Sequence, residues 1–151
     1  MAGSGDGLDY SAAAVAERVR RSNAKVFAAY FAFQAVVGIG FWVALATSAG
    51  IRELFELRPT LPAVTDAFFL ADLIVGVAGS ALGSWALWSD ARWAVPVIAA
   101  TTGGLLYATL FLVLWVAMEG TGGACLAIMV PPSAISTYAT WWAWRSQRPP
   151  A

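Results

Sequence analysis

Long runs of apolar residues, separated by short polar segments, dominate the pattern of this chain. Four stretches contain no charged residue except Asp72. A bilayer core of about 30 Å requires about 20 apolar residues in a helix that rises about 1.5 Å per residue. The pattern therefore predicts four membrane spans, at residues 26–47, 67–89, 93–118 and 124–144.

The spans are expected to be helices, because lipid cannot satisfy free backbone groups and the runs lack the alternation of barrel strands. The predicted fold is therefore an all-α integral membrane four-helix bundle with short loops. Residues 1–23 are expected to be an N-terminal cytoplasmic segment, partly disordered. Residues 24–146 form the membrane domain and residues 147–151 a cytoplasmic tail.

The distribution of basic residues predicts the orientation of the bundle. Seven of the nine fall on one side of a four-span arrangement, and only Arg52 and Arg58 fall on the other. Because cytoplasmic segments carry an excess of Lys and Arg, both termini are expected in the cytoplasm, with the spans in the cell membrane. The seven are Arg18, Arg20, Arg21, Lys25, Arg92, Arg145 and Arg148.

Composition supports the membrane interpretation and excludes several kinds of chemistry. The chain is 60% hydrophobic and 12% charged, whereas soluble domains average about 45–50% and about 25%. It has no histidine and one cysteine, so histidine-ligated metal sites and an intramolecular disulfide are excluded. No cofactor, metal or nucleic acid is expected, since nucleotide-binding motifs and a basic patch are absent. Arg greatly outnumbers Lys in an Ala-rich chain, which favours a bacterial origin.

The first outer connection, residues 50–65, contains the segment IRELFEL. Its apolar residues alternate with charges at helical spacing. The segment predicts a short amphipathic helix on the membrane surface, closed by Arg58 and Pro59. A turn that is apolar by chance is the alternative.

Small and polar residues predict which helix faces meet, because membrane helices associate through such residues. At about 100° per residue, Gly76, Gly79 and Gly83 share a face with Asp72. Three further stripes are expected to line one interior together with this face. They are Tyr30, Gln34, Gly38 and Phe41; Ala100, Gly103, Tyr107 and Phe111; and Ser133, Ser136, Thr137 and Thr140. For the last stripe, whose side chains carry hydroxyl groups, the alternative is a structural role in helix-to-helix hydrogen bonding.

Asp72 is the most informative position in the chain. A carboxylate within a span costs about 2.5–3.5 kcal/mol on insertion scales, which favours a functional role. The alternative is a buried structural hydrogen-bonder, or a side chain that snorkels outward through a short span. Asp72 is expected about 9 Å below the outer boundary at Asp66, near the depth of Pro131 and Pro132. Each proline removes a backbone donor, which predicts a kinked or opened helix beside the carboxyl group. The predicted ligand-binding residues are Asp72, Tyr107, Pro131, Pro132, Phe41, Phe111 and Ser133.

Three functions remain open from the sequence. The first is binding or transport of a small lipophilic or cationic ligand in an outer-half pocket around Asp72. The second is a membrane enzyme of the isomerase or cyclase type, acting on a lipid or isoprenoid with Asp72 as catalytic general acid. The third is a non-catalytic accessory subunit, in which the glycine faces bind a partner membrane subunit or a second copy. The lipid bilayer is the expected surrounding in all three.

Overall fold

The computed structural model describes residues 6–146. The first five residues, which belong to the segment expected to be partly disordered, and the predicted tail 147–151 lie outside this range. The described residues form helices joined by short connections and contain no strand, which confirms the all-α prediction. In chain order the elements are α1 (Asp6–Thr47), α2 (Ala49–Phe55), α3 (Ala63–Asp66), α4 (Phe69–Ala71), the π-helix η1 (Asp72–Ala78), α5 (Gly79–Trp88), α6 (Ala94–Glu119) and α7 (Gly123–Ser146).

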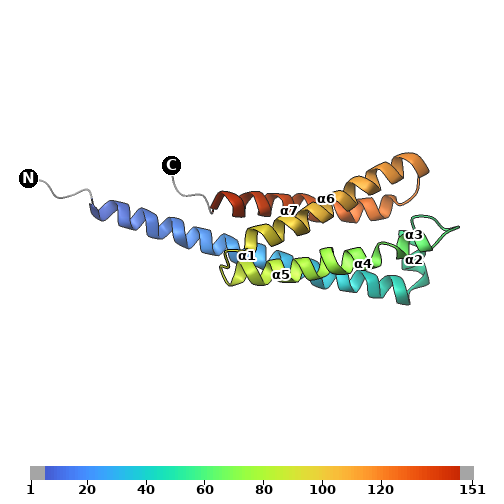
Figure 1. The fold of residues 1–151 in the computed structure, drawn as a ribbon, viewed down its shortest axis with the longest axis horizontal. Helices are drawn as coiled ribbons and strands as arrows, with labels where there is room; N and C mark the ends of the chain where they lie inside the picture. The colour runs from blue at the N-terminus through green and yellow to red at the C-terminus, as the bar shows by residue number, and fades with distance from the viewer. Residues whose placement is uncertain (1–5, 147–151) are drawn as a thin grey trace, which may run out of the picture.

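The long helices form two antiparallel hairpins. In the first, α1 packs on η1 and α5, and in the second α6 packs on α7 (Figure 1). The hairpins meet mainly through α5 and α6, while α1 and α7 make little contact with each other. The turn between α6 and α7 is tight because Gly120 and Gly122 adopt φ angles of 71° and 81°, which glycine tolerates best. Helix α1 begins, and α7 ends, at the same end of the bundle (Figure 1).

Within residues 6–146, three segments are long and apolar enough to cross a membrane. They are Ala12–Thr47, Ala63–Trp88 and Ala94–Glu119. In the most apolar 18 residues of each segment, only 17% of the residues are buried in the first two segments and 28% in the third. Apolar side chains that face outward in this proportion require an apolar surrounding, which is what a bilayer supplies. Helix α7 is less apolar, since it contains two prolines and several hydroxyl side chains.

Two separate clusters of buried side chains hold the helices together. The first lies at the end where α5 turns into α6 and is built around Phe31 and Ile98, both completely buried. The second lies towards the α2 end and contains Leu57, Leu112 and Cys125. The interior is therefore filled at both ends rather than along its whole length.

Hydroxyl side chains join α6 to α7 and α7 to α1. Three pairs of hydroxyl oxygens lie within hydrogen-bond distance: 2.7 Å for Thr109 and Ser133, 2.8 Å for Thr102 and Thr140, and 3.1 Å for Ser136 and Tyr30. The fourth member of the stripe, Thr137, donates to the carbonyl of its own helix instead. The hydroxyl stripe of α7 thus serves mainly in hydrogen bonding between helices, which was the alternative interpretation.

The π-helix η1 divides the predicted glycine face of the second span. Added side-chain atoms at Gly79 and Gly83 would meet Thr101 and Ile98 of α6, whereas Gly76 has open space beside it. Asp72 and Gly76 line the cavity, whereas Gly79 and Gly83 pack against α6, so the predicted face is divided between the cavity and a helix contact. A π-helix bonds each residue to the fifth one before it and turns less per residue than an α-helix, which shifts the later glycines relative to Asp72.

The predicted inner face of the third span is wrong. Gly103 and Tyr107 are exposed, and Tyr107 has 72% of its surface accessible. The buried face of α6 passes through Ile98, Thr101 and Leu105 instead. On this side the Thr102 hydroxyl donates to the Ser136 carbonyl of α7, and Gly104 lies close against Val75 of η1.

Substitution of Gly83 by Leu is expected to destabilise the fold. A Cβ atom there would lie 2.9 Å from Cγ2 of the buried Ile98, so a larger side chain must push α5 and α6 apart. Overpacking of this kind costs about 1–3 kcal/mol, more than the roughly 0.5–1 kcal/mol that replacing a helical glycine returns. Thermal unfolding in detergent measures the effect. The exposed Gly103 has open space, so Gly103→Leu is the matched control, and an equal loss there would contradict the packing argument.

Candidate functional site

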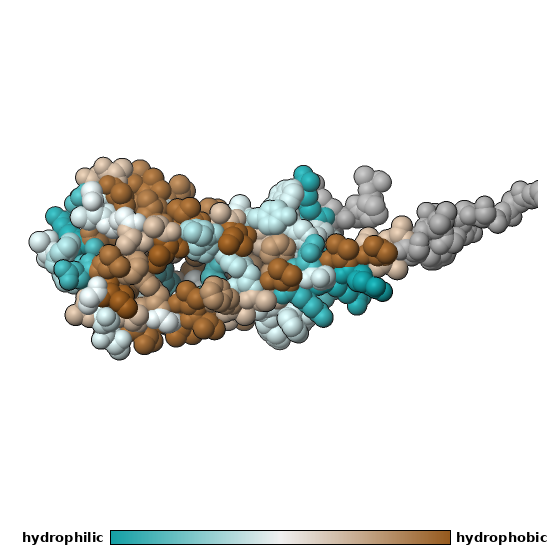
Figure 2. Space-filling view, turned by 180° about the vertical axis from the view of Figure 1, so that it is seen from behind, coloured by the Kyte–Doolittle hydropathy of each residue, from teal (hydrophilic) through white to brown (hydrophobic). Residues whose placement is uncertain are grey.

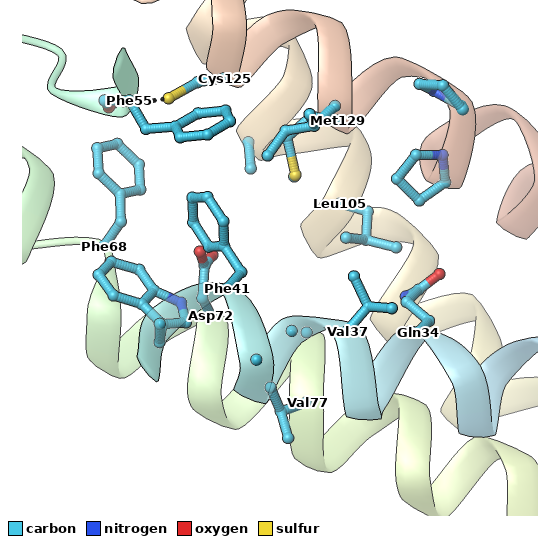
Figure 3. A pocket seen from close by; sticks show the side chains of 18 of the residues that line it. Gln34, Val37, Phe41, Phe55, Phe68, Asp72, Val77, Leu105, Cys125 and Met129 are labelled. Atoms are coloured by element: carbon cyan, nitrogen blue, oxygen red, sulfur yellow. Dashed lines mark hydrogen bonds between the residues drawn. The ribbon is translucent and has the colours of Figure 1, made fainter. Parts of the chain in front are cut away.

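A cavity of about 740 Å³ lies between the two buried clusters. Its walls come from α1, α2, η1, α6 and α7, and Figure 3 shows their side chains turned towards the same space. On α1 the lining extends from Tyr30 to Ala44, a length of about 21 Å at the rise of an α-helix. The cavity is therefore elongated along the helices.

Asp72 is the one acidic side chain that lines this cavity. It stands at the start of η1, and its carboxyl group points into the space bounded by Phe41, Phe55 and Phe68 (Figure 3). The side chain of Trp42 acts on it as a hydrogen-bond donor. Asp72 forms no ion pair with any residue in the described range. The site therefore combines an acid that has no cationic neighbour with aromatic walls.

A charged network lies at the α2 end of the bundle, outside the cavity wall. Arg52 contacts Glu56 at 3.1 Å and Asp66 at 2.7 Å, which ties α2 to α3. The Glu56 side chain is only 7% exposed and also accepts a hydrogen bond from the Thr65 hydroxyl. Hydrogen bonding to Asp66 raises the pKa of Arg52 above its ordinary value. Arg52 is thus held by these two carboxylates at the bundle end.

The opposite end of the cavity is polar but already satisfied. The Tyr30 hydroxyl donates to the Pro132 carbonyl at 2.9 Å. Gln34 donates to Ser80 at 2.8 Å and accepts from Ser136 at 3.2 Å. These groups connect α1, α5 and α7, so Asp72 is left as the polar group most available to a ligand.

The structure brings together four of the seven predicted ligand-binding residues. Asp72, Phe41, Pro131 and Pro132 all line the cavity. The other three are placed elsewhere: Tyr107 faces outward, Ser133 is buried against Thr109, and Phe111 lies behind Phe68 with ring centroids 5.1 Å apart.

The sequence predicts a kinked or an opened helix at the prolines of α7, and the opened form is not observed. Helix α7 continues through Pro131 and Pro132 without a break. Among the described residues, no hydrogen bond joins Asp72 to the carbonyls that the prolines leave free. The prolines instead contribute apolar surface to the wall, and the neighbouring carbonyl of Pro132 is the acceptor for Tyr30.

Sequence reasoning did not place Phe55, Phe68 or Cys125 at the site. Phe55 belongs to the amphipathic segment, which forms the expected helix as α2 but turns Ile51 and Phe55 into the cavity. Phe68 precedes the π-helix by one turn. The apolar face of IRELFEL was the usable signal, because a short amphipathic helix covers a bundle end as readily as a membrane surface.

Substitution of Tyr30 by Phe is expected to destabilise the contact between α1 and α7. The change removes one hydroxyl that bonds both the Pro132 carbonyl and Ser136. A loss of about 1–2 kcal/mol follows for bonds in this setting, and unfolding in detergent measures it. Tyr138→Phe is the control, because that side chain is exposed. Equal midpoints for the two variants would contradict the expected role of the Tyr30 hydroxyl.

No protein family matches this sequence, and neither a characterised protein nor a solved structure gives a match. Within the described residues, no group of three or more His, Cys, Asp or Glu side chains is arranged to hold a metal ion. The fold and site therefore define an all-helical chain with three potential membrane spans and an acidic, aromatic-lined internal cavity.

Proposed function

We propose that this protein binds an elongated lipophilic molecule that carries a cationic amine, with the amine at Asp72 and the chain along α1. The observation that carries the proposal is a carboxyl group with no ion-pair partner among the described residues, placed in a cavity whose walls are mainly apolar. An acid in such surroundings is stabilised by a cation more than by any neutral group.

The dimensions and walls of the cavity agree with such a ligand. Small-molecule sites typically have volumes of about 300–1,000 Å³ and apolar walls with few polar groups. The aromatic rings of Phe41, Trp42 and Phe68 surround the carboxyl group, and ring faces attract cations. An alkyl chain fits the elongated remainder, whose lining residues towards the other end include Val37 and Leu105 (Figure 3).

The proposed setting is a bilayer crossed four times. Helix α7 is paired with α6 along its length and, with 24 residues, spans about 36 Å, enough for a fourth crossing. The four crossings would leave both termini on one side, and the charge distribution favours the cytoplasm. The cell membrane as location and a bacterial source belong to the same proposal.

Binding is tested by titrating the purified protein in detergent with three long-chain compounds of equal tail length. A primary amine and its quaternary trimethylammonium analogue are expected to bind, and the corresponding alcohol is expected to bind at least about tenfold more weakly. Equal binding of all three, or of none, would contradict recognition of a cation. The amine and its quaternary analogue together separate charge from hydrogen bonding.

The cavity gives less support to the enzyme hypothesis. A general acid can act alone, but catalytic sites usually hold the reacting atoms with further polar groups. The other ionisable residues on the described wall are Tyr30 and Cys125, and both already donate hydrogen bonds to backbone carbonyls.

Copurification of a stoichiometric membrane partner, without amine binding, would favour the accessory-subunit hypothesis instead.

A further inference from the structure

The lining residues with high exposure gather on two helices only. They are Phe33, Val37 and Gly40 on α1 and Ile128, Pro131 and Ile135 on α7. We call this edge of the cavity the α1–α7 opening. Its large side chains are accessible over 67% at Phe33, 49% at Val37, 42% at Ile128 and 44% at Ile135. Figure 2 shows a hollow between apolar side chains on one face of the molecule.

The other sides of the cavity are closed. Leu57, Leu112 and Cys125 fill the α2 end beneath the Arg52 network. Phe31 and Ile98 fill the opposite end. The lining residues of η1 and α6 are buried or half-buried.

The α1–α7 opening is apolar and lies within the most apolar part of α1. No charged residue stands between Lys25 and Arg52, and α7 is uncharged before Arg145. An opening without charge in this position faces hydrocarbon rather than water. We infer that the ligand enters the cavity sideways from the bilayer, through the α1–α7 opening, and does not come from the aqueous phase. This inference rests on the proposed function for the identity of the ligand.

The ligand class follows from the opening and the acid together. A molecule that arrives from the hydrocarbon layer and then meets Asp72 is a membrane-resident amphiphile with an alkyl chain and an amine. Helix α1 of a second copy could not occupy the site in the same way, because its uncharged part has no cation that could pair with Asp72. Charge complementarity therefore favours a small cationic amphiphile as the occupant.

The single cysteine of the chain provides a direct test. Cys125 lines the cavity and is 9% exposed. In vesicles, a long-chain maleimide dissolved in the membrane is expected to label Cys125 more than about tenfold faster than a sulfonated maleimide supplied to both faces. Faster labelling by the sulfonated reagent would show access from water and would overturn the inference.

Two further cysteine variants test the route if Cys125 reacts slowly with both maleimides. Gly76→Cys in a Cys125→Ala chain places a thiol at a second point of the wall, and Gly103→Cys in the same chain places one on the exposed face of α6. Labelling by the long-chain reagent at Cys125 or position 76, as well as at position 103, supports the inference. Labelling at position 103 alone overturns it.

Closing the opening is expected to slow entrance of the reagent. Gly40 lies at the opening with no atom within 4 Å of an added Cβ, so Gly40→Trp introduces a bulky side chain there. Labelling of Cys125 by the long-chain maleimide is expected to fall about tenfold or more, and Gly103→Trp is expected to leave it unchanged. An unchanged rate in both variants would overturn the α1–α7 opening as the route.

These experiments report the route independently of the ligand. A protein that fails to bind amines in detergent but is labelled from the bilayer would contradict the proposed function and retain the opening. A protein that binds amines but is labelled from water would retain the function and contradict the route.

Discussion

Replacing Asp72 by Asn is expected to lower the affinity for a long-chain amine by about 10- to 100-fold. The amide keeps the size of the carboxyl group but removes its charge, and hydrogen bonds to charged groups are worth about 1.5–3 kcal/mol. The affinity for the corresponding alcohol is expected to change little, since its attraction to the site depends on the apolar walls. Titration of both compounds against the purified variant measures the difference.

Asp66→Asn is the matched control for this result. Asp66 lies on the same segment and undergoes the same chemical change, but its side chain is 57% exposed and pairs with Arg52 outside the cavity wall. Its amine affinity is expected to stay within about twofold of the unmodified protein, because exposed charges act weakly at a distance. Equal losses in the two variants would indicate a general effect of negative charge instead of a site at Asp72.

The helical nature of the chain could be predicted because it depends on short-range properties. Uncharged runs of the length of a bilayer specify helices without any knowledge of packing. The same reasoning found the amphipathic helix after the first span, now α2. It could not decide whether the apolar face of α2 meets lipid or covers the bundle, because both surroundings are apolar. In the structure Phe55 turns to the cavity while Leu54 is 63% exposed.

The position of the acid was easier to predict than its neighbours. Asp72 stands out in any apolar run, and the stripe of α1 that passes through Tyr30, Gln34 and Phe41 lies on the cavity wall as its spacing indicated. On the second span, a uniform turn of about 100° per residue placed Gly76 beside Asp72 on the cavity wall, but it also placed Gly79 and Gly83 there, which pack against α6. The π-helix begins at Asp72 itself, and nothing in a single sequence marks such a change of pitch.

The face of α6 illustrates a different limit. Glycine and alanine permit close approach of helices, but they do not require it. Thr101 and Thr102 on the buried side had no stripe pattern that distinguished them from Gly103 beside them. Thr102 bonds the Ser136 carbonyl and the Thr140 hydroxyl, which belong to a helix more than thirty positions away, whereas Thr101 donates to the Val97 carbonyl of its own helix.

Filling the cavity from its wall is expected to remove binding of amine and alcohol alike. Gly76 lines the cavity, and no atom lies within 4 Å of an added Cβ, so Gly76→Phe projects a ring into space that the ligand needs. The affinity for both compounds should fall at least about tenfold, because the new ring occupies the space of the alkyl chain, which both compounds have. The charge of Asp72 is unchanged in this variant. The unfolding midpoint in detergent is expected to stay unchanged or rise, since the new ring buries apolar surface in a void.

Gly103→Phe is the control for that variant, because Gly103 is a helical glycine with equal space for a Cβ but lies on the outward face of α6. Its affinities should match those of the unmodified protein. The two substitutions at the site then give different signatures: loss of charge at Asp72 lowers the amine to the level of the alcohol, and loss of space at Gly76 lowers both. An amine that binds Gly76→Phe normally would have to sit outside the cavity, and the carboxyl group of Asp72 would then have no part in holding it.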